Sequence, residues 1–172
     1  MPDIIIVAGP NGAGKTSFAK AYLPRHKRRF TYVNADEIAR HLETDGNLEH
    51  SEAKAARLML ERVDTAVARG ENIMIETTLA SRTYARKIVQ WRQRHYTIGL
   101  IYLKLANPEL SIARVARRVA AGGHAIPEHV IRRRFIKSLD YLDKFYKPIV
   151  DEWYIWNSLE GSFEPSEAWD MS

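Results

Sequence analysis

The chain has 172 residues, of which 45% are hydrophobic and 27% charged, and its formal net charge is +5 at pH 7. These values are ordinary for one globular domain, here residues 1–172, and the positive charge suits polyanionic ligands. The absence of cysteine excludes disulfides, thiolate metal sites and cysteine nucleophiles. No apolar stretch is long enough to cross a membrane and no signal peptide is visible, so we expect a cytoplasmic protein without a membrane partner.

The stretch from Gly9 to Thr16 reads Gly-Pro-Asn-Gly-Ala-Gly-Lys-Thr, which is the P-loop pattern G-x-x-x-x-G-K-T. Its glycines let the backbone curl so that successive N–H groups surround a phosphate. Lys15 brings a positive charge to the β- and γ-phosphates, and the Thr16 hydroxyl is placed to ligate Mg²⁺. The residues that we expect to bind the cofactor ATP are Gly9, Pro10, Asn11, Gly12, Ala13, Gly14, Lys15, Thr16 and Ser17.

The segments around this loop predict alternating strands and helices. Residues 4–8 form an apolar run, typical of a central parallel strand, and residues 17–23 predict a helix that ends at Pro24. Further strands are expected at 30–33, 72–76, 96–105 and 153–156. Further helices are expected at 37–42, at 48–69, from a cap at Ser81, from Asn107 to Gly122, and from Pro127 to Tyr146. The tail after Asn157 is predicted to be irregular.

Strands that alternate with helices form βαβ units, and right-handed crossovers leave few topologies. We therefore expect an α/β protein with the P-loop NTPase or kinase fold. Its parallel five-stranded sheet would have the order 2-3-1-4-5, with helices on both faces and a helical lid at about residues 111–135. Ligands of such sheets lie at the carboxyl ends of the strands, and the remaining candidate residues follow those ends.

Asp36 follows the second expected strand. In phosphoryl transfer, a carboxylate at this place accepts the proton of the attacking hydroxyl or holds Mg²⁺ through water. The alternative is that Asp36 only caps the helix that begins at Glu37, although capping is compatible with a catalytic role. We expect Asp36 to be a catalytic residue in contact with the acceptor.

Glu76, Thr77 and Thr78 end the third expected strand at the same edge. A carboxylate beside two hydroxyls suits the binding of an acceptor's hydroxyl groups, and we assign all three residues to the substrate. Two alternatives stay open: Glu76 as a ligand of Mg²⁺ or of its water, and the group as a cap for the next helix.

Arginines concentrate on the two helices that flank Gly122 and Gly123. A Gly-Gly hinge between such helices predicts a mobile lid whose arginines close over the γ-phosphate and exclude water. Arg114 and Arg118 share one helix face, whereas Arg117 points elsewhere. From the run of Arg132, Arg133 and Arg134 we expect one or two to act. The arginines that we assign to catalysis, together with Lys15, are Arg118, Arg133 and Arg134.

Four parts of the chain together resemble the short bacterial branch of the zeta toxin family. They read AGPNGAGKT from Ala8, VNADEI from Val33, ETTLA from Glu76, and RVAAGGHAIP from Arg118 followed by IRRRF from Ile131. The resemblance implies a P-loop kinase that uses ATP and Mg²⁺ to phosphorylate the 3′-hydroxyl of UDP-N-acetylglucosamine, and it implies an antitoxin as a possible partner. By the same likeness Asp36 is the general base, Glu76 and Thr78 face the sugar nucleotide, and the lid arginines hold the phosphates.

Other functions are also compatible with the loop. An ABC-type ATPase is set aside because neither a Leu-Ser-Gly-Gly-Gln-like segment nor a strand that ends in Asp-Glu is present. The acceptor of a kinase could instead be NAD, a nucleoside, an antibiotic or a polynucleotide end, although base-stacking aromatic residues are not clustered with the charges, which argues against nucleic acid. A protein that senses nucleotides and hydrolyses them slowly is the remaining alternative.

Overall fold

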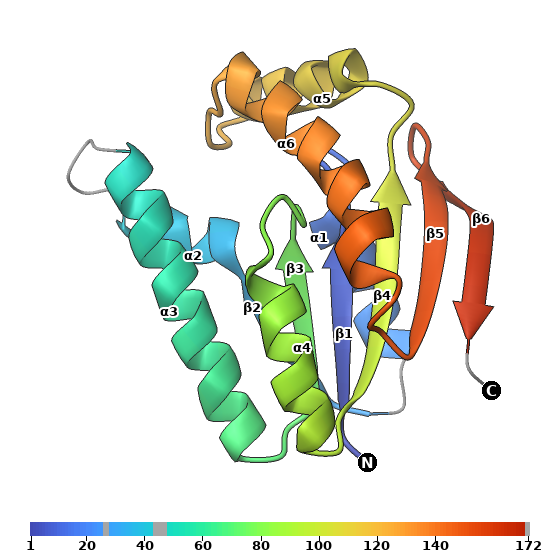
Figure 1. Ribbon diagram of the computed structural model, residues 1–172. Helices are drawn as coiled ribbons and strands as arrows, with labels where there is room; N and C mark the ends of the chain where they lie inside the picture. The colour runs from blue at the N-terminus through green and yellow to red at the C-terminus, as the bar shows by residue number, and fades with distance from the viewer. Residues whose placement is uncertain (26–27, 43–47, 171–172) are drawn as a thin grey trace.

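One six-stranded sheet runs through the protein, and helices cover both of its faces (Figure 1). The computed structural model describes residues 1–25, 28–42 and 48–170. The strands are β1 (Asp3–Ala8), β2 (Thr31–Asn34), β3 (Ile73–Thr77), β4 (Thr97–Lys104), β5 (Glu152–Ser158) and β6 (Phe163–Asp170). The helical segments are α1 (Lys15–Tyr22), η1 (Leu23–Arg25), α2 (Ala35–Leu42), α3 (Leu48–Ala68), α4 (Thr83–Gln93), α5 (Pro108–Ala120), α6 (Glu128–Tyr141) and η2 (Leu142–Tyr146).

The sheet has the order β2-β3-β1-β4-β5-β6. The first five strands are parallel and confirm the predicted order 2-3-1-4-5, with Ile6 of β1 opposite Ile75 of β3 and Leu100 of β4. Their carboxyl ends point to the top of Figure 1, where α5 and α6 lie across the end of the sheet. Helices α5 and α6 therefore lie at the edge where ligands of such sheets are expected, while their action as a mobile lid stays a prediction.

The prediction of a purely parallel five-stranded sheet with an irregular tail was wrong. Residues 163–170 form β6, which pairs antiparallel with β5 and makes the sixth strand. Pro165 lies within β6, and Ser166 is the extra residue of a bulge between the pairs Ile155–Glu167 and Trp156–Pro165. Because proline cannot donate a ladder hydrogen bond, it is tolerated only at bulges and on edge strands, and β6 provides both.

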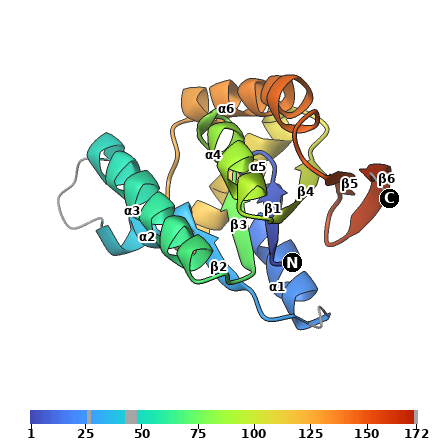
Figure 2. The ribbon, with the colours of Figure 1, turned by 60° about the horizontal axis from the view of Figure 1, so that its bottom comes forward.

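Strand β1 is buried on both faces, as its unbroken apolar sequence predicts. Ile4 and Ile6 belong to the cluster that packs against α3, α4 and η2, whereas Ile5 and Val7 belong to the cluster that packs against α1. The two views of the ribbon show α3 and α4 on one side of the sheet and α1 on the other (Figures 1 and 2). The sheet is thus the middle layer of three, and the loop after β1 emerges at its centre.

Helix starts follow the capping rules in one case and depart from them in another. The Asn107 side chain accepts a hydrogen bond of 2.8 Å from the Leu110 amide and caps α5, as predicted. Helix α4 begins at Thr83 with Arg82 at the cap position, so Ser81 lies one residue earlier than a cap, and its hydroxyl accepts a hydrogen bond of 3.4 Å from the Thr83 amide. Among the residues that the structure describes, no helix combines the length and the apolar character that crossing a membrane requires.

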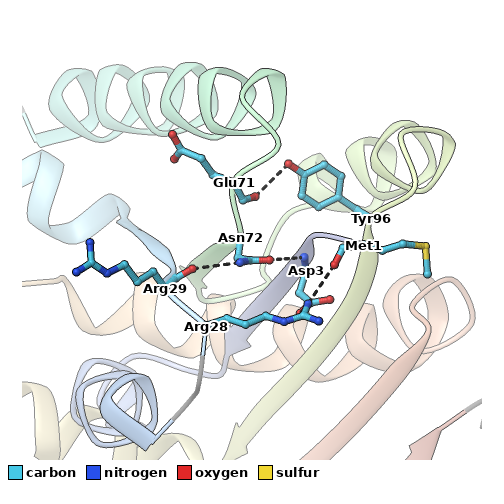
Figure 3. A network of polar contacts seen from close by, with 7 residues as sticks. All are labelled: Met1, Asp3, Arg28, Arg29, Glu71, Asn72 and Tyr96. Atoms are coloured by element: carbon cyan, nitrogen blue, oxygen red, sulfur yellow. Dashed lines mark hydrogen bonds and ion pairs between the residues drawn. The ribbon is translucent and has the colours of Figure 1, made fainter.

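A polar network ties together the other end of the sheet, at the amino ends of the strands (Figure 3). The Asn72 side chain accepts a hydrogen bond from the Asp3 amide at 2.9 Å and donates one to the Arg29 carbonyl at 3.2 Å. Arg28 donates to the Met1 carbonyl and to the Asp3 carboxylate. Tyr96 donates to the Glu71 carbonyl at 3.0 Å. These bonds hold the starts of β1, β3 and β4 in register, at the end opposite the phosphate loop.

Candidate active site

The loop between β1 and α1 has the backbone geometry of a phosphate-binding loop. Gly12 and Gly14 adopt positive φ angles of 79° and 82°, a region that favours glycine. The Ala13 amide donates to the Pro10 carbonyl at 3.1 Å and closes a turn inside the loop. Helix α1 begins directly afterwards at Lys15, so its positive end faces the same space.

Lys15 is buried, with 7% of its surface exposed, and lies over the loop. Its ammonium donates hydrogen bonds of 3.0 Å to the carbonyls of Gly9 and Pro10. The positive charge of Lys15 is therefore already positioned at the loop, where an anionic ligand would bind. Ser17, which we also assigned to the nucleotide, is exposed on the first turn of α1.

Thr16 and Glu76 are joined directly, which the sequence did not predict. The Thr16 hydroxyl donates to the Glu76 carboxylate, whose oxygens lie 2.9 and 3.0 Å away. Tyr32 of β2 donates a hydrogen bond to the same carboxylate, and Asn34 donates to the Tyr32 hydroxyl at 3.2 Å. Burial, and next the hydrogen bond to Glu76, raise the pKa of Tyr32 above its usual range, so this hydroxyl stays a donor.

This arrangement suits Mg²⁺, which prefers oxygen ligands and usually takes one or two from the protein, with water and phosphate supplying the others. Thr16 and Glu76 present a hydroxyl and a carboxylate side by side at the phosphate loop. Among the side chains that the structure describes, no group of three or more His, Cys, Asp or Glu residues offers a fuller cage. The donor set therefore fits magnesium bound together with a nucleotide.

Thr77 is the last residue of β3, and Thr78 follows it in the segment that leaves the strand. The Thr77 hydroxyl accepts a hydrogen bond of 3.1 Å from the Leu79 amide. Leu79 is buried and has a φ angle of 62°, in the left-handed region that non-glycine residues rarely adopt. Strain of this kind persists where the surrounding structure fixes the backbone, and here it sets the path of the segment that carries both threonines.

A cavity of about 800 Å³ opens at this edge of the sheet, between α3 and α6. It brings together most of the side chains that we predicted for the acceptor and for catalysis. The predicted residues that line it are Lys15, Glu76, Thr77, Thr78, Arg133 and Arg134. Lys137 of α6 adds a further positive charge to the cavity wall, His129 of α6 also lines the cavity, and alanines of α3 line another part of it. The cavity size is that of a site for a small molecule.

The other lid arginines lie elsewhere. Arg118 is exposed on α5 and is not part of the cavity lining, so its assignment to catalysis stays a prediction. Arg132 pairs with Glu128 of its own helix at 2.9 Å and with Glu109 of α5 at 2.6 Å. Arg114 donates to the Gly12 carbonyl at 3.3 Å and therefore contacts the phosphate loop itself.

Asp36 is the second residue of α2. One residue, Ala35, separates it from the end of β2 at the carboxyl edge of the sheet. Its side chain lies outside the described part of the structure, so its role as base also stays a prediction.

Sequence reasoning missed Tyr32 at this site and favoured Arg118 over Arg114 on α5. A signal for Tyr32 was available. In a strand, residues two apart point to the same face, so a polar side chain at position 32 shares the face of Asn34 at the strand end.

A model of the family described as zeta toxin matches residues 1–154. An uncharacterised protein of Haemophilus influenzae is 22% identical over 131 residues, which are 76% of this chain and 91% of that protein. A structure of the PezAT chromosomal toxin–antitoxin system of Streptococcus pneumoniae is similar with a TM-score of 0.69 and 20% identity, over 92% of this chain and 68% of that one. The AvrRxo1-ORF1:-ORF2 structure with ATP is similar with a TM-score of 0.69 and 16% identity.

The last similarity covers 98% of this chain and 58% of the other, so this chain spans little more than half the length of that relative. At such identities the two solved structures establish the fold. The family match, which covers most of the chain and contains the phosphate loop, the end of β3 and the lid, establishes more. This chain belongs to the zeta toxin family and is a nucleotide-binding, kinase-type phosphotransferase.

Proposed function

We propose that this protein transfers the γ-phosphoryl group of ATP to a hydroxyl of a small molecule, for which a nucleotide sugar such as UDP-N-acetylglucosamine is the favoured acceptor. One observation carries the proposal. A single cavity of about 800 Å³ joins Lys15 of the phosphate loop to Glu76 and to two arginines of α6. Because it continues between α3 and α6, it has room for an acceptor beside the phosphates.

The phosphates of ATP would bind to the loop amides and to Lys15. Lys15 would exchange its two carbonyl partners for phosphate oxygens, without a large movement of its buried stem. Because positive φ angles at Gly12 and Gly14 already curl the loop, little backbone order has to be gained on binding.

Thr16 and Glu76 would hold Mg²⁺. When bound, the ion neutralises charge that develops on the phosphate oxygens. The Thr16 hydroxyl can continue to donate its hydrogen bond to Glu76 while its oxygen offers a lone pair to the ion, since a hydroxyl both donates and accepts. Tyr32 holds Glu76 from the other side and fixes the carboxylate in this orientation.

The acceptor would lie between the end of β3 and α6. Thr77 and Thr78 would bind its hydroxyl groups, while Asp36 would accept the proton of the attacking hydroxyl. Arg133 and Arg134 line the same cavity and would stabilise the negative charge of the group in transfer. The cationic wall that they form with Lys137 favours an acceptor that itself carries phosphate, as a nucleotide sugar does.

The decisive experiment incubates the protein with Mg²⁺ and γ-labelled ATP, separately with UDP-N-acetylglucosamine, other nucleotide sugars, NAD and single-stranded oligonucleotides. We expect label on a nucleotide sugar with the wild type, and none with Asp36→Asn. Label on another acceptor would support the kinase activity but contradict the nucleotide sugar as substrate. Release of free phosphate alone, whatever acceptor is present, would contradict the proposal and favour a slow nucleotide-hydrolysing protein.

The arginines of α6 offer a matched control. Arg133→Gln and Arg134→Gln remove charge from the cavity, whereas Arg132→Gln removes the same charge from a residue that pairs with Glu109 and Glu128. The first two variants should lose transfer by roughly 10²-fold or more, the size found when a charge that faces the transition state is removed. Arg132→Gln should stay within a few-fold of the wild type.

We also propose that the protein acts as a toxin that an antitoxin protein neutralises. Support comes from the family and from the similar PezAT structure, which is part of a toxin–antitoxin system. Expression of the chain in bacteria should arrest growth, and Lys15→Ala should abolish the arrest because the charge at the phosphates is lost. Normal growth with an active, well-expressed wild-type protein would contradict the toxin role.

A further inference from the structure

The C-terminal hairpin, formed by β5, the turn at residues 159–162 and β6, lies against the phosphate loop. The family match ends at residue 154, so most of this hairpin lies beyond it. Figure 1 shows β5 and β6 at the edge of the sheet beside β4, and their connecting turn lies at the top of the strands, below α5. Contacts from Ser158, Phe163 and Arg114 reach three successive residues of the loop.

Ser158 is the last residue of β5 and is buried, with 5% of its surface exposed. Its hydroxyl donates a hydrogen bond of 2.8 Å to the Ala13 carbonyl. Arg114 of α5 donates to the same hydroxyl at 2.7 Å, to the Ser158 carbonyl at 3.3 Å and to the Gly12 carbonyl at 3.3 Å. The carbonyls of Gly12 and Ala13 are therefore both held on the outer side of the loop.

Phe163, the first residue of β6, covers the next position of the loop. A Cβ atom on Gly14 would lie only 3.1 Å from the Phe163 ring, so the ring sits directly on the Gly14 backbone. The same ring packs edge-on against Phe18 of α1, with 5.2 Å between the ring centroids and an interplanar angle of 89°. Phe163 thereby fixes the junction between the loop and α1.

These contacts bear on nucleotide binding because of how a phosphate loop works. Its amides can point inward at a phosphate only if the carbonyls between them point outward, and outward carbonyls need donors. For the Gly12 and Ala13 carbonyls, Arg114 and Ser158 are those donors, while the Phe163 ring packs against Gly14. Building on the proposed function, we propose that Ser158 and Phe163 are positioning residues that set the affinity of the phosphate loop for nucleotide.

The test measures the dissociation constant of a fluorescent ADP analogue by titration, together with the KM values for ATP and for the acceptor. Ser158→Ala and Phe163→Ala should each raise the dissociation constant by about tenfold, the equivalent of one hydrogen bond or packing contact. The KM for ATP should rise with it, while the KM for the acceptor should stay unchanged. Ser158→Thr, which keeps the hydroxyl, should restore most of the affinity.

Trp169→Ala is the matched control. Trp169 lies near the other end of β6, opposite Trp153, and its removal also takes an aromatic side chain from this edge strand. It should leave nucleotide affinity unchanged, even if thermal stability falls. The inference is overturned if Ser158→Ala and Phe163→Ala bind the analogue as tightly as the wild type, or weaken it no more than Trp169→Ala does. A wild-type protein that binds no nucleotide would instead refute the proposed function, and this inference with it.

Discussion

Thr16 and Glu76, sixty residues apart in the sequence, share one hydrogen-bonded unit in which a single hydroxyl lies within 3.0 Å of both carboxylate oxygens. Thr16 is the second residue of the helix after the phosphate loop, and Glu76 is the penultimate residue of β3, the strand beside β1. The unit therefore links the two neighbouring strand ends at which the reaction would take place. It also supports the proposal that Glu76 is a ligand of Mg²⁺, while the assignment of Glu76 to the substrate stays a prediction.

Glu76→Gln should raise the Mg²⁺ concentration needed for half-maximal phosphotransfer. The amide keeps the volume but loses the negative charge, and we expect a rise of roughly 10- to 100-fold with a lower maximal rate. The measurement is the initial rate of transfer across a magnesium titration. Glu71→Gln, at the opposite end of the sheet, is the control and should behave as the wild type. An unchanged magnesium requirement in Glu76→Gln would rule out Glu76 as a ligand.

Tyr32→Phe tests whether the hydrogen bond from Tyr32 orients the Glu76 carboxylate for Mg²⁺. The variant removes the hydroxyl that donates to Glu76 but keeps the ring, so we expect a magnesium requirement several-fold to about tenfold higher at a similar thermal stability. Tyr96→Phe is the same substitution in the network of Figure 3, where the hydroxyl donates to the Glu71 carbonyl. It should lower the free energy of unfolding and leave the Mg²⁺ concentration for half-maximal transfer unchanged. The reverse pattern would mean that Tyr32 serves only the fold.

Asn72→Ala should separate stability from activity. The Asn72 side chain bridges the Asp3 amide and the Arg29 carbonyl, and its loss leaves both groups without that partner (Figure 3). The free energy of unfolding should fall by about 1–3 kcal/mol. Urea unfolding gives this value, and nucleotide titration should give the wild-type dissociation constant. A large loss of nucleotide affinity would show that the two ends of the sheet are coupled.

The pH dependence of stability should reveal the buried tyrosines. Burial raises the pKa of Tyr102 to about 12. An unfolded tyrosine ionises near pH 10, so between about pH 10 and 12 the unfolded chain has released a proton that the folded protein still holds. The free energy of unfolding therefore falls as pH rises through this window.

Tyr102→Phe should make that fall shallower, by about 1.4 kcal/mol for each pH unit within the window. At pH 8 the variant should already be less stable by about 1 kcal/mol, because Ser138 loses its 2.8 Å hydrogen bond to the phenol. Urea unfolding at several pH values from 8 to 11 measures both effects. Identical pH slopes for the two proteins would contradict a raised pKa.

Much of the fold could be predicted because local patterns decide it. The apolar run at residues 4–8 leads into glycines that impose the loop, and the alternation of strands and helices then fixes the order of the first five strands. The cavity residues at the end of β3 and on α6 were also predicted, since a parallel sheet gathers its strand ends at one edge.

The contacts around the phosphate loop could not be predicted, because they join distant residues. Ser158 lies 145 residues from Ala13, and Arg114 lies 102 residues from Gly12. No spacing rule links such pairs, and nothing in the helix pattern of α5 distinguishes Arg114 from Arg118, one turn later on the same face. Strand β6 was missed because Pro165 and its glutamates suggest a loop, and the bulge at Ser166 breaks the alternation by which strands are found.

Strand β6 also decides how the sheet ends. This edge strand contains a proline, which has no amide hydrogen, and a bulge that increases the local twist, and its sequence includes Glu164 and Glu167. A strand from another molecule would therefore meet an edge that a proline and a bulge interrupt, next to charged residues, and both features disfavour pairing. The hairpin that contacts the phosphate loop therefore also disfavours edge-to-edge association of the protein at high concentration.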